Sequence, residues 1–189
     1  HPKKYRDRHV QTAERDWSKV DANQCWVADH RILDIWVARQ WYDKKARADR
    51  ITWQRPWLSM FLDARTWKPV SQRIEFDDPN SQRVMECFID GVQEHGTPGA
   101  VILDNGKDFR AERFGGGRPK KKGQTEIFRT ARVTPLLELL GIDVRWALPY
   151  NARAKVIEPF FSIVAERFDK NWETYCGNNT LATPEQIKG

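Results

Sequence analysis

Long apolar runs are missing from this sequence of 189 residues, and no stretch approaches the roughly 20 apolar residues that a membrane-spanning helix needs. The apolar central region of a secretory signal is also not visible. The charged fraction is 31% and the mean hydropathy is −0.74. The sequence therefore predicts a soluble protein without a membrane partner.

Cysteine is scarce as well. The chain has three cysteines and four histidines, and neither CxxC spacing nor a zinc-ligand pattern is present. This composition argues against a disulfide framework and against a Cys/His zinc site. We interpret the cysteines as reduced, structural thiols of a cytosolic protein.

Charge is unevenly distributed along the chain. The 32 Lys and Arg outnumber the 26 Asp and Glu, which gives a net charge of +6 and a pI near 9.3. A mildly basic domain without a charged partner would also fit these totals. The basic residues cluster, however, at 44–50 and 118–122, and clustering favours a polyanion as partner.

The length predicts one domain with insertions, and no internal repeat is visible. We expect a fragment of a longer protein, because the sequence begins with His1. The expected divisions are a basic N-terminal arm or linker at 1–20, a core at 21–175, and a polar tail at 176–189 leading to a missing C-terminal domain. Within the core, 38–54 is expected to be a charged, exposed insertion and 105–125 a flexible basic loop.

Apolar periodicity predicts an α/β protein with a five-stranded mixed sheet and helices on both faces. The short apolar run at 99–103 is typical of a strand covered on both faces, and a strand–helix–strand order favours a right-handed crossover. Strands are expected at 25–37, 56–62, 67–76, 99–103 and 142–148, and helices at 81–95, 134–140 and 152–173. The last helix would bury an apolar face of Phe160, Phe161, Val164 and Phe168.

Three acidic residues stand out by their settings. Asp29 follows the apolar run 25–28, Asp104 ends the apolar strand, and Glu158 lies near the start of the last helix. A carboxylate at the end of a buried strand is costly unless it is neutralised. Carboxylates are good ligands for Mg²⁺ or Mn²⁺, and two such ions can hold the attacking and leaving oxygens of a phosphodiester. The set therefore indicates a divalent-metal site, which should be loosely ordered when empty because three anions repel one another.

Other interpretations of the same acids remain open. Asp34 lies five residues from Asp29 and would face the other side of one unbroken strand. Asp63 opens a turn, where a capping role is expected. Asp104 precedes Asn105-Gly106 and can be read as a strand-terminating turn.

Glu158 alone is compatible with a solvated helix face, shared with Asn151, Lys155 and Ser162 at helical spacing. Proline is tolerated only in the first turn of a helix. Pro159 therefore predicts that the regular helix begins near 155–158. Lys155, three residues before Glu158, could meet a DNA phosphate near the scissile bond.

The ordered motifs resemble the DDE transposase and retroviral integrase superfamily, and the insertion and spacing look closest to phage Mu-type transposases. The resemblance covers about residues 20–170. It rests on Trp26-x-x-Asp29, on Pro56-Trp57-Leu58 to Asp63, on Leu103-Asp104-Asn105-Gly106, and on Pro149-Tyr150-Asn151-x-x-x-Lys155-x-x-Glu158.

The resemblance implies an RNase H-like fold, with Asp29 on the first strand, Asp104 just after the fourth and Glu158 on a helix. These three residues would be the catalytic residues and would bind two Mg²⁺ or Mn²⁺ ions. The implied reaction is nicking of transposon ends by water, followed by attack of the exposed 3′-OH on target DNA. The residues expected to contact DNA are Lys155, Asn151, Lys120, Lys121 and Lys122.

The resemblance also implies partners and a compartment. The expected partners are transposon-end and target DNA, further copies of the chain on paired ends, and an accessory ATPase that selects the target. The expected compartment is the cytoplasm of a bacterial host. Two alternatives remain: a nuclease or junction resolvase that only hydrolyses DNA, and a non-catalytic nucleic-acid-binding module.

Overall fold

The computed structural model describes residues 16–104, 108–109, 114, 135–147 and 156–177. A five-stranded mixed sheet lies at its centre, in the order β5-β4-β1-β6-β7. The strands of this sheet are β1 (Cys25–Ile32), β4 (Trp57–Asp63), β5 (Pro69–Glu75), β6 (Ala100–Leu103) and β7 (Asp143–Trp146).

Strand direction divides the sheet into two halves. β4 pairs antiparallel with both β1 and β5, whereas β6 pairs parallel with both β1 and β7. The parallel half needs crossover connections, and α2 (Ser81–His95) supplies the one that leads into β6. This is the predicted five-stranded mixed sheet of an RNase H-like α/β fold.

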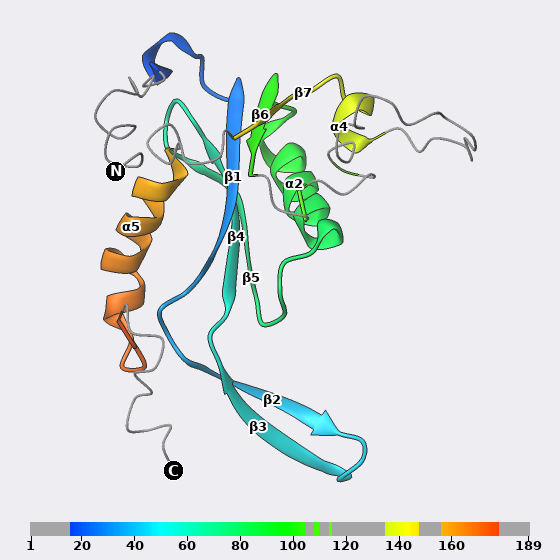
Figure 1. Cartoon of the computed structure of the whole chain (residues 1–189), viewed down its shortest axis with the longest axis vertical. Coiled ribbons are helices and arrows are strands. Elements are labelled where there is room, and N and C mark those ends of the chain that lie inside the picture. The colour runs from blue at the N-terminus through cyan, green and yellow to red at the C-terminus, as the bar shows by residue number, and fades with distance from the viewer. Residues whose placement is uncertain (1–15, 105–107, 110–113, 115–134, 148–155, 178–189) are drawn as a thin grey trace, which may run out of the picture.

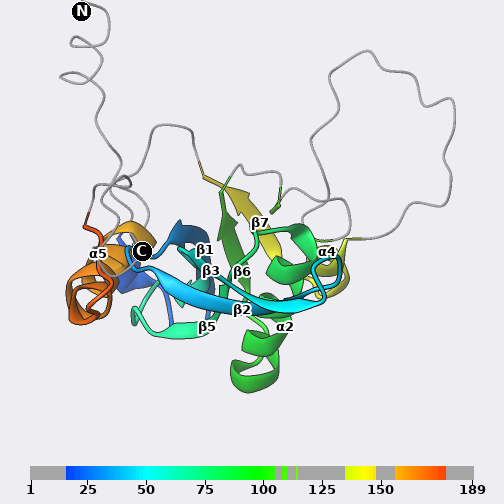
Figure 2. The ribbon, with the colours of Figure 1, turned by 90° about the horizontal axis from the view of Figure 1, so that it is seen from below.

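Helices cover both faces of this sheet, as predicted. Figures 1 and 2 show α2 on one side and α5 (Ile157–Arg167) on the other. The side of α2 buries Trp26, Phe61 and Phe88, while the side of α5 buries Val27 and Ile102 against the start of that helix. The central strands are therefore apolar on both faces.

α2 forms where the sequence indicates it should. Asn80 caps its first turn by accepting hydrogen bonds from the backbone N–H groups of Gln82 and Arg83. The helix packs closely on the sheet at Gly91, where a Cβ atom would lie 3.2 Å from the ring of Trp26. Gly96 ends it with a positive φ of 78°.

Several boundaries differ from prediction. The run 25–37 is interrupted, since β1 ends at Ile32 and a separate strand begins at Val37. The insertion 38–54 is exposed as expected, but it forms a regular hairpin of β2 (Val37–Asp43) and β3 (Ala48–Gln54) outside the main sheet. Backbone pairing within the hairpin explains how such a polar segment is ordered.

The helical predictions at the C-terminal end were too long. α4 spans only Leu136–Leu139, and α5 ends at Arg167 before a single turn of 3₁₀ helix, η3 (Asp169–Asn171). Phe168 was predicted to be buried, but it is 37% exposed because it lies past the end of α5. A further 3₁₀ turn, η1 (Trp17–Lys19), precedes β1.

The three cysteines are buried and form no disulfide, which confirms their interpretation as structural thiols. Among the helices in the described part of the chain, none is long and apolar enough to cross a membrane.

Candidate active site

Asp29 lies in the second half of β1 and is partly buried. One of its carboxylate oxygens accepts a hydrogen bond of 2.9 Å from the backbone N–H of His30. In the antiparallel pairing of β1 with β4, Asp29 stands opposite Met60. Pairing with β4 therefore fixes the backbone of Asp29.

Asp104 is the first residue after β6 and is also partly buried. In the parallel pairing of β1 with β6, Val27 stands beside Ile102. Counting two residues further along each strand sets Asp29 beside Asp104. The parallel register thus gives these two acids corresponding positions at the carboxyl end of β6, the edge where open α/β sheets bind ligands.

Because of the pleat of the sheet, the side chains of Asp29 and Asp104 are expected on the same face of the sheet. Val27 and Ile102 belong to the apolar cluster beneath α5, which also contains Ile157. Side chains two residues apart on a strand point to the same side. The same alternation directs Asp29 and Asp104 toward the side of the sheet that α5 covers.

Glu158 is the second residue of α5, directly after the fully buried Ile157. Its side chain is exposed, and its backbone carbonyl accepts a hydrogen bond of 3.3 Å from the hydroxyl of Ser162. Pro159 is the third helical residue, so it lies in the first turn and interrupts no intrahelical hydrogen bond. The prediction that the helix begins near 155–158 is confirmed.

The three acids do not form a ready metal site. Among the residues described, no group of three or more His, Cys, Asp or Glu side chains is arranged so that it could hold a metal ion. Asp29 and Asp104 supply the oxygen donors that Mg²⁺ or Mn²⁺ prefers. The chemistry of the acids fits such an ion, while the arrangement of Glu158 is not that of a third ligand.

His30 was not predicted to belong to this region. Its Nδ1 atom lies 2.8 Å from the hydroxyl of Ser59, and its ring stacks on Phe109 with centroids 4.5 Å apart. Burial lowers the pKa of His30 to about 4, and the charge of Asp104 opposes that shift. The imidazole is therefore neutral at pH 7. Its stacking on Phe109 packs the segment that follows Asp104 against β1.

The position of His30 directly after Asp29 was its only signal in the sequence. Its role depends on Phe109, which comes from a different segment, so sequence spacing alone could not reveal it.

The two rival aspartates have structural roles. Asp63 accepts hydrogen bonds from the backbone N–H and the hydroxyl of Thr66, which confirms the predicted turn function. Asp34 accepts hydrogen bonds from the guanidinium groups of Arg31 and Arg55 at 3.1 and 2.5 Å.

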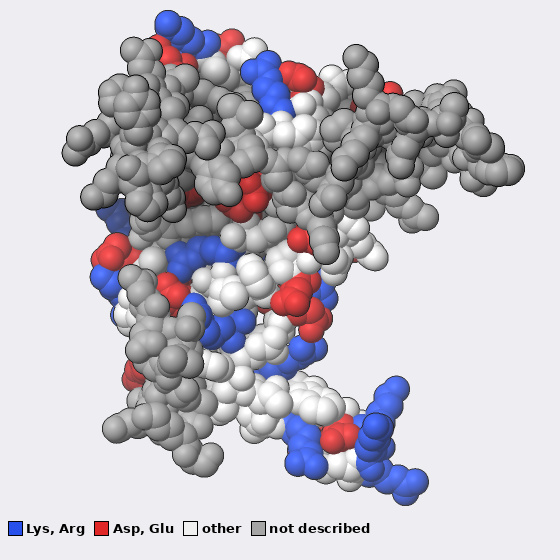
Figure 3. Space-filling model, in the orientation of Figure 1, with Lys and Arg blue, Asp and Glu red and all other residues white. Residues whose placement is uncertain are grey.

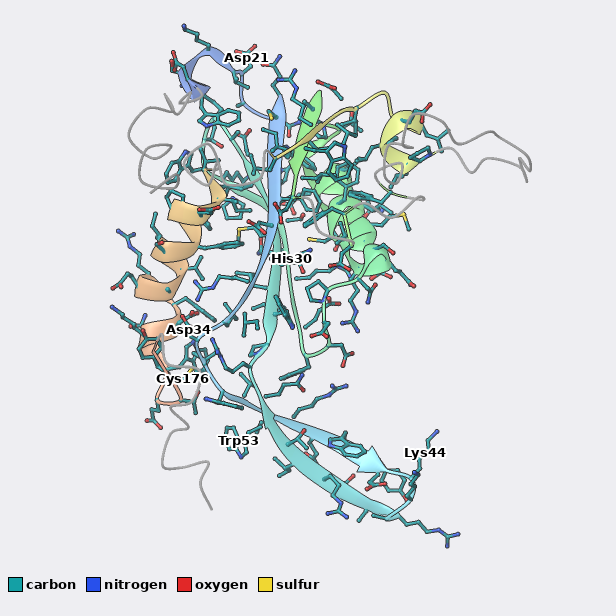
Figure 4. All side chains as sticks on the ribbon, viewed as in Figure 1. Asp21, His30, Asp34, Lys44, Trp53 and Cys176 are labelled. Atoms are coloured by element: carbon teal, nitrogen blue, oxygen red, sulfur yellow. The ribbon has the colours of Figure 1, made fainter. Side chains whose placement is uncertain are left out.

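A buried ionic network fastens the segment after α5 to the end of β1. Asp169 is completely buried and accepts hydrogen bonds from Arg31 at 2.5 Å and from the backbone N–H of Asp34 at 3.0 Å. Arg31 also donates to the backbone carbonyl of Phe161 at 2.6 Å. These contacts hold α5, and with it Glu158, on its face of the sheet; Figure 4 labels Asp34 close to the end of α5.

A pocket of about 220 Å³ lies elsewhere, between β5 and α2, and its lining includes Ser71, Asp90 and His95. It is on the α2 side of the sheet, away from the side to which Asp29 points. It has no part in the candidate site.

The predicted DNA-contacting residues lie outside the described residues. These are Asn151, Lys155, Lys120, Lys121 and Lys122. The same holds for most of the predicted flexible loop 105–125 and of the terminal segments.

No protein-family model matches the chain. The chain is 24% identical over 169 residues to the transposase of transposon Tn552 from Staphylococcus aureus. That alignment covers 85% of this chain but only 30% of the transposase, so the chain spans less than a third of the length of its relative.

Solved retroviral structures are also similar. The HTLV-2 integrase catalytic core domain in complex with magnesium (dimeric form) gives a TM-score of 0.48 at 13% identity, covering 84% of this chain and 78% of that one. The BIV integrase catalytic core domain gives 0.46 at 15% identity, covering 81% and 76%. The simian T-cell lymphotropic virus intasome with the PP2A regulatory subunit B56 gamma gives 0.47 at 14% identity, covering 76% and 39%.

Proposed function

We propose that this chain is the catalytic core of a DNA transposase, acting through Asp29, Asp104 and Glu158 on phosphodiester bonds. The observation that carries the proposal is the parallel register of β1 and β6, which pairs Val27 with Ile102 and, extended by two residues, would set Asp29 beside Asp104. The similarity to the Tn552 transposase supports the same conclusion. Kinship with phage Mu-type transposases is part of the proposal and rests on sequence motifs alone.

The proposed reaction has two transfers at phosphorus. In the first, water attacks the phosphodiester at a transposon end, and the 3′ oxygen leaves as a free 3′-OH. In the second, that 3′-OH attacks a phosphodiester of target DNA, so one P–O bond forms while another breaks and releases a new 3′-OH. The two steps share one geometry, with nucleophile and leaving oxygen in line.

Asp29 and Asp104 would bind the divalent ions, with Glu158 as the third ligand. Two bound ions, when present, would stabilise the charge on the attacking and leaving oxygens. Repulsion among three carboxylates opposes their approach in the absence of cations. Glu158 sits on the first turn of α5, so its approach to the aspartates would require that turn to move.

The remaining partners belong to the same proposal. DNA would contact Asn151, Lys155 and the lysines 120–122, and copies of the chain would assemble on paired transposon ends. An accessory ATPase would select the target, and the reaction would take place in the bacterial cytoplasm. The proposed domain order is an arm at 1–20, the core at 21–175 and a tail at 176–189 that leads to a further domain.

The test is a cleavage and strand-transfer assay with Mg²⁺ or Mn²⁺, using the full-length protein. We expect Asp29→Asn, Asp104→Asn and Glu158→Gln each to lower both steps by more than about a hundredfold, since loss of even an outer-sphere partner of a metal costs about 10- to 100-fold. Glu166→Gln is the matched control, because Glu166 is an exposed acid of the same helix and pairs with Lys170.

Mn²⁺ titration by calorimetry separates the alternatives. Loss of Mn²⁺ binding in Asp29→Asn and Asp104→Asn, with an unchanged melting temperature, supports the metal site. Near-normal activity in any of the three variants would refute the triad. Hydrolysis without joined products would point to a nuclease or resolvase, and absence of Mn²⁺ binding in the wild type would point to a non-catalytic DNA-binding module.

A further inference from the structure

The hairpin of β2 and β3 is a separate two-stranded ribbon. It pairs residue for residue from Val37 with Gln54 to Asp43 with Ala48, and neither strand pairs with the main sheet. Seven residues per strand give it a length of about 24 Å. Figure 1 shows it extending away from the five-stranded sheet as an arm.

Contacts with the rest of the protein hold the base of the β2–β3 hairpin, and hydrogen bonds order its turn. Arg39 donates to Asp77 at 3.2 Å and lies 5.5 Å above the ring of Phe76. At the far end, Asp43 accepts hydrogen bonds from the backbone N–H groups of Lys45 and Ala46 at 2.9 and 3.1 Å. The arm is therefore a preformed element with a defined tip.

One face of the arm carries exposed apolar side chains. Because directly paired residues share a face, Tyr42, Ile51 and Trp53 all lie on the same side of the ribbon. Their exposed fractions are 57%, 65% and 38%. A two-stranded hairpin is only marginally stable by itself in water, and such a face is typical of a binding surface.

The charge of the arm identifies the kind of partner. Residues 37–54 contain five Lys and Arg against two Asp. Asp43 is already engaged, since it lies 3.6 Å from Arg50. The remaining cations, Lys44, Lys45 and Arg47, are exposed together at the tip; Figure 3 shows basic side chains gathered there, and Figure 4 labels Lys44 at the tip and Trp53 nearer the base.

We propose that the β2–β3 hairpin is a DNA-binding arm that seats in the major groove of a duplex. The major groove admits a two-stranded β-ribbon, and Lys and Arg neutralise phosphates. Tyr42, Ile51 and Trp53 would face sugars and base edges, where thymine methyl groups offer apolar contact. The proposal rests on the proposed function, which makes DNA the substrate, and it assigns duplex recognition to a surface distant from the carboxylates.

Charge also distinguishes DNA from a second copy of the chain as the occupant. Two arms with basic tips repel each other, whereas the phosphate backbone attracts them. The arm would steer the duplex by sequence-independent phosphate contacts, so its contribution should depend strongly on salt.

The test is duplex-DNA binding followed by fluorescence anisotropy over a range of salt concentrations. The arm variant combines Lys44→Ala, Lys45→Ala and Arg47→Ala. The control combines Lys19→Ala, Arg65→Ala and Lys68→Ala, three exposed cations in the turns near the start of β1. Thermal melting checks that both variants fold.

We expect the arm variant to lose at least about tenfold in affinity near physiological salt, and the slope of log affinity against log salt to fall by about 2 to 3. The control variant should change neither the affinity nor the salt slope as much. A second variant, Tyr42→Thr with Ile51→Thr, should weaken binding with little change in slope.

Equal loss of affinity in the arm and control variants would overturn the proposal. So would wild-type DNA affinity in the arm variant, or loss of self-association in sedimentation without loss of DNA binding. The proposed function fails separately, if the wild type neither binds nor cleaves DNA. Asp29→Asn should keep wild-type DNA affinity while losing cleavage, which distinguishes the arm from the catalytic centre.

Discussion

The ring of His30 is neutral and largely buried. We expect the protein to lose stability between pH 7 and pH 5 because of this one residue. A protonated imidazole carries N–H groups on both nitrogens. Nε2 of His30 is buried and has no hydrogen-bond partner among the described residues, and the ring is stacked against Phe109. A second proton would therefore be both desolvated and without an acceptor.

The size of this loss of stability follows from the shift in the pKa of His30. Burial lowers the pKa of His30 from 6.5 to about 4 in the folded state, against the opposing charge of Asp104. Because the folded pKa is below the unfolded one, the stability is fully present above pH 6.5 and is lost as the pH falls toward 4. The unfolded chain takes up a proton that the folded chain excludes, so the loss between pH 7 and pH 5 is about 2 kcal/mol, rising to about 3 kcal/mol at pH 4.

The measurement is urea unfolding at several pH values for the wild type and for His30→Gln, which cannot titrate. Other carboxylates titrate in both proteins, so the difference between the two free energies of unfolding isolates His30. On going from pH 7 to pH 5, we expect the wild type to lose about 2 kcal/mol more of its free energy of unfolding than the variant does. A difference that stays constant with pH would refute the buried neutral ring, as would an imidazole pKa near 6.5 by NMR.

Asp169→Ala should lower the free energy of unfolding in urea by about 3 kcal/mol, because it leaves the largely buried Arg31 without its closest partner, whereas Lys170→Ala at an exposed pair should have a much smaller effect. Burial raises the pKa of the Cys87 thiol to about 11, so this thiol should resist a disulfide reagent at pH 8 until urea unfolds the protein; rapid reaction in the native state would contradict it. Asn80→Ala should cost about 1 kcal/mol by loss of the cap of α2, and Asn80→Asp should be nearly neutral; equal losses in thermal unfolding would exclude capping as the cause.

Local patterns predicted the regular elements well where one or both faces of the element are apolar. α2 was identified from the spacing of Val84, Cys87 and Phe88 and from its end signals at Asn80 and Gly96. The short strand β6 was identified because it is apolar on both faces. In each case the residues that signal the element also stabilise it, so local sequence was sufficient.

The hairpin of β2 and β3 was missed for the opposite reason. Its high charge resembles an irregular excursion, and its apolar residues Tyr42, Ile51 and Trp53 remain exposed instead of joining a core. The ion pair of Arg31 with Asp169 was also invisible in the sequence, because it joins the end of β1 to η3 at the other end of the chain. Contacts of this kind exist only once distant elements pack.

Local sequence patterns were enough to indicate the strands of the main sheet, the helix α2, the basic character and the three candidate acids, but not the β2–β3 hairpin. The relative placement of those acids depends on long-range packing. The register of β1 with β6, extended by two residues, would set Asp29 beside Asp104, because β6, reached through β2 to β5 and α2, inserts beside β1 in parallel. That insertion is driven by burial of Trp26 and Phe88 between the sheet and α2, a long-range packing effect that no local pattern encodes. The position of Glu158 likewise depends on how Ile157 and the Arg31 network dock α5, and not on its spacing from the aspartates.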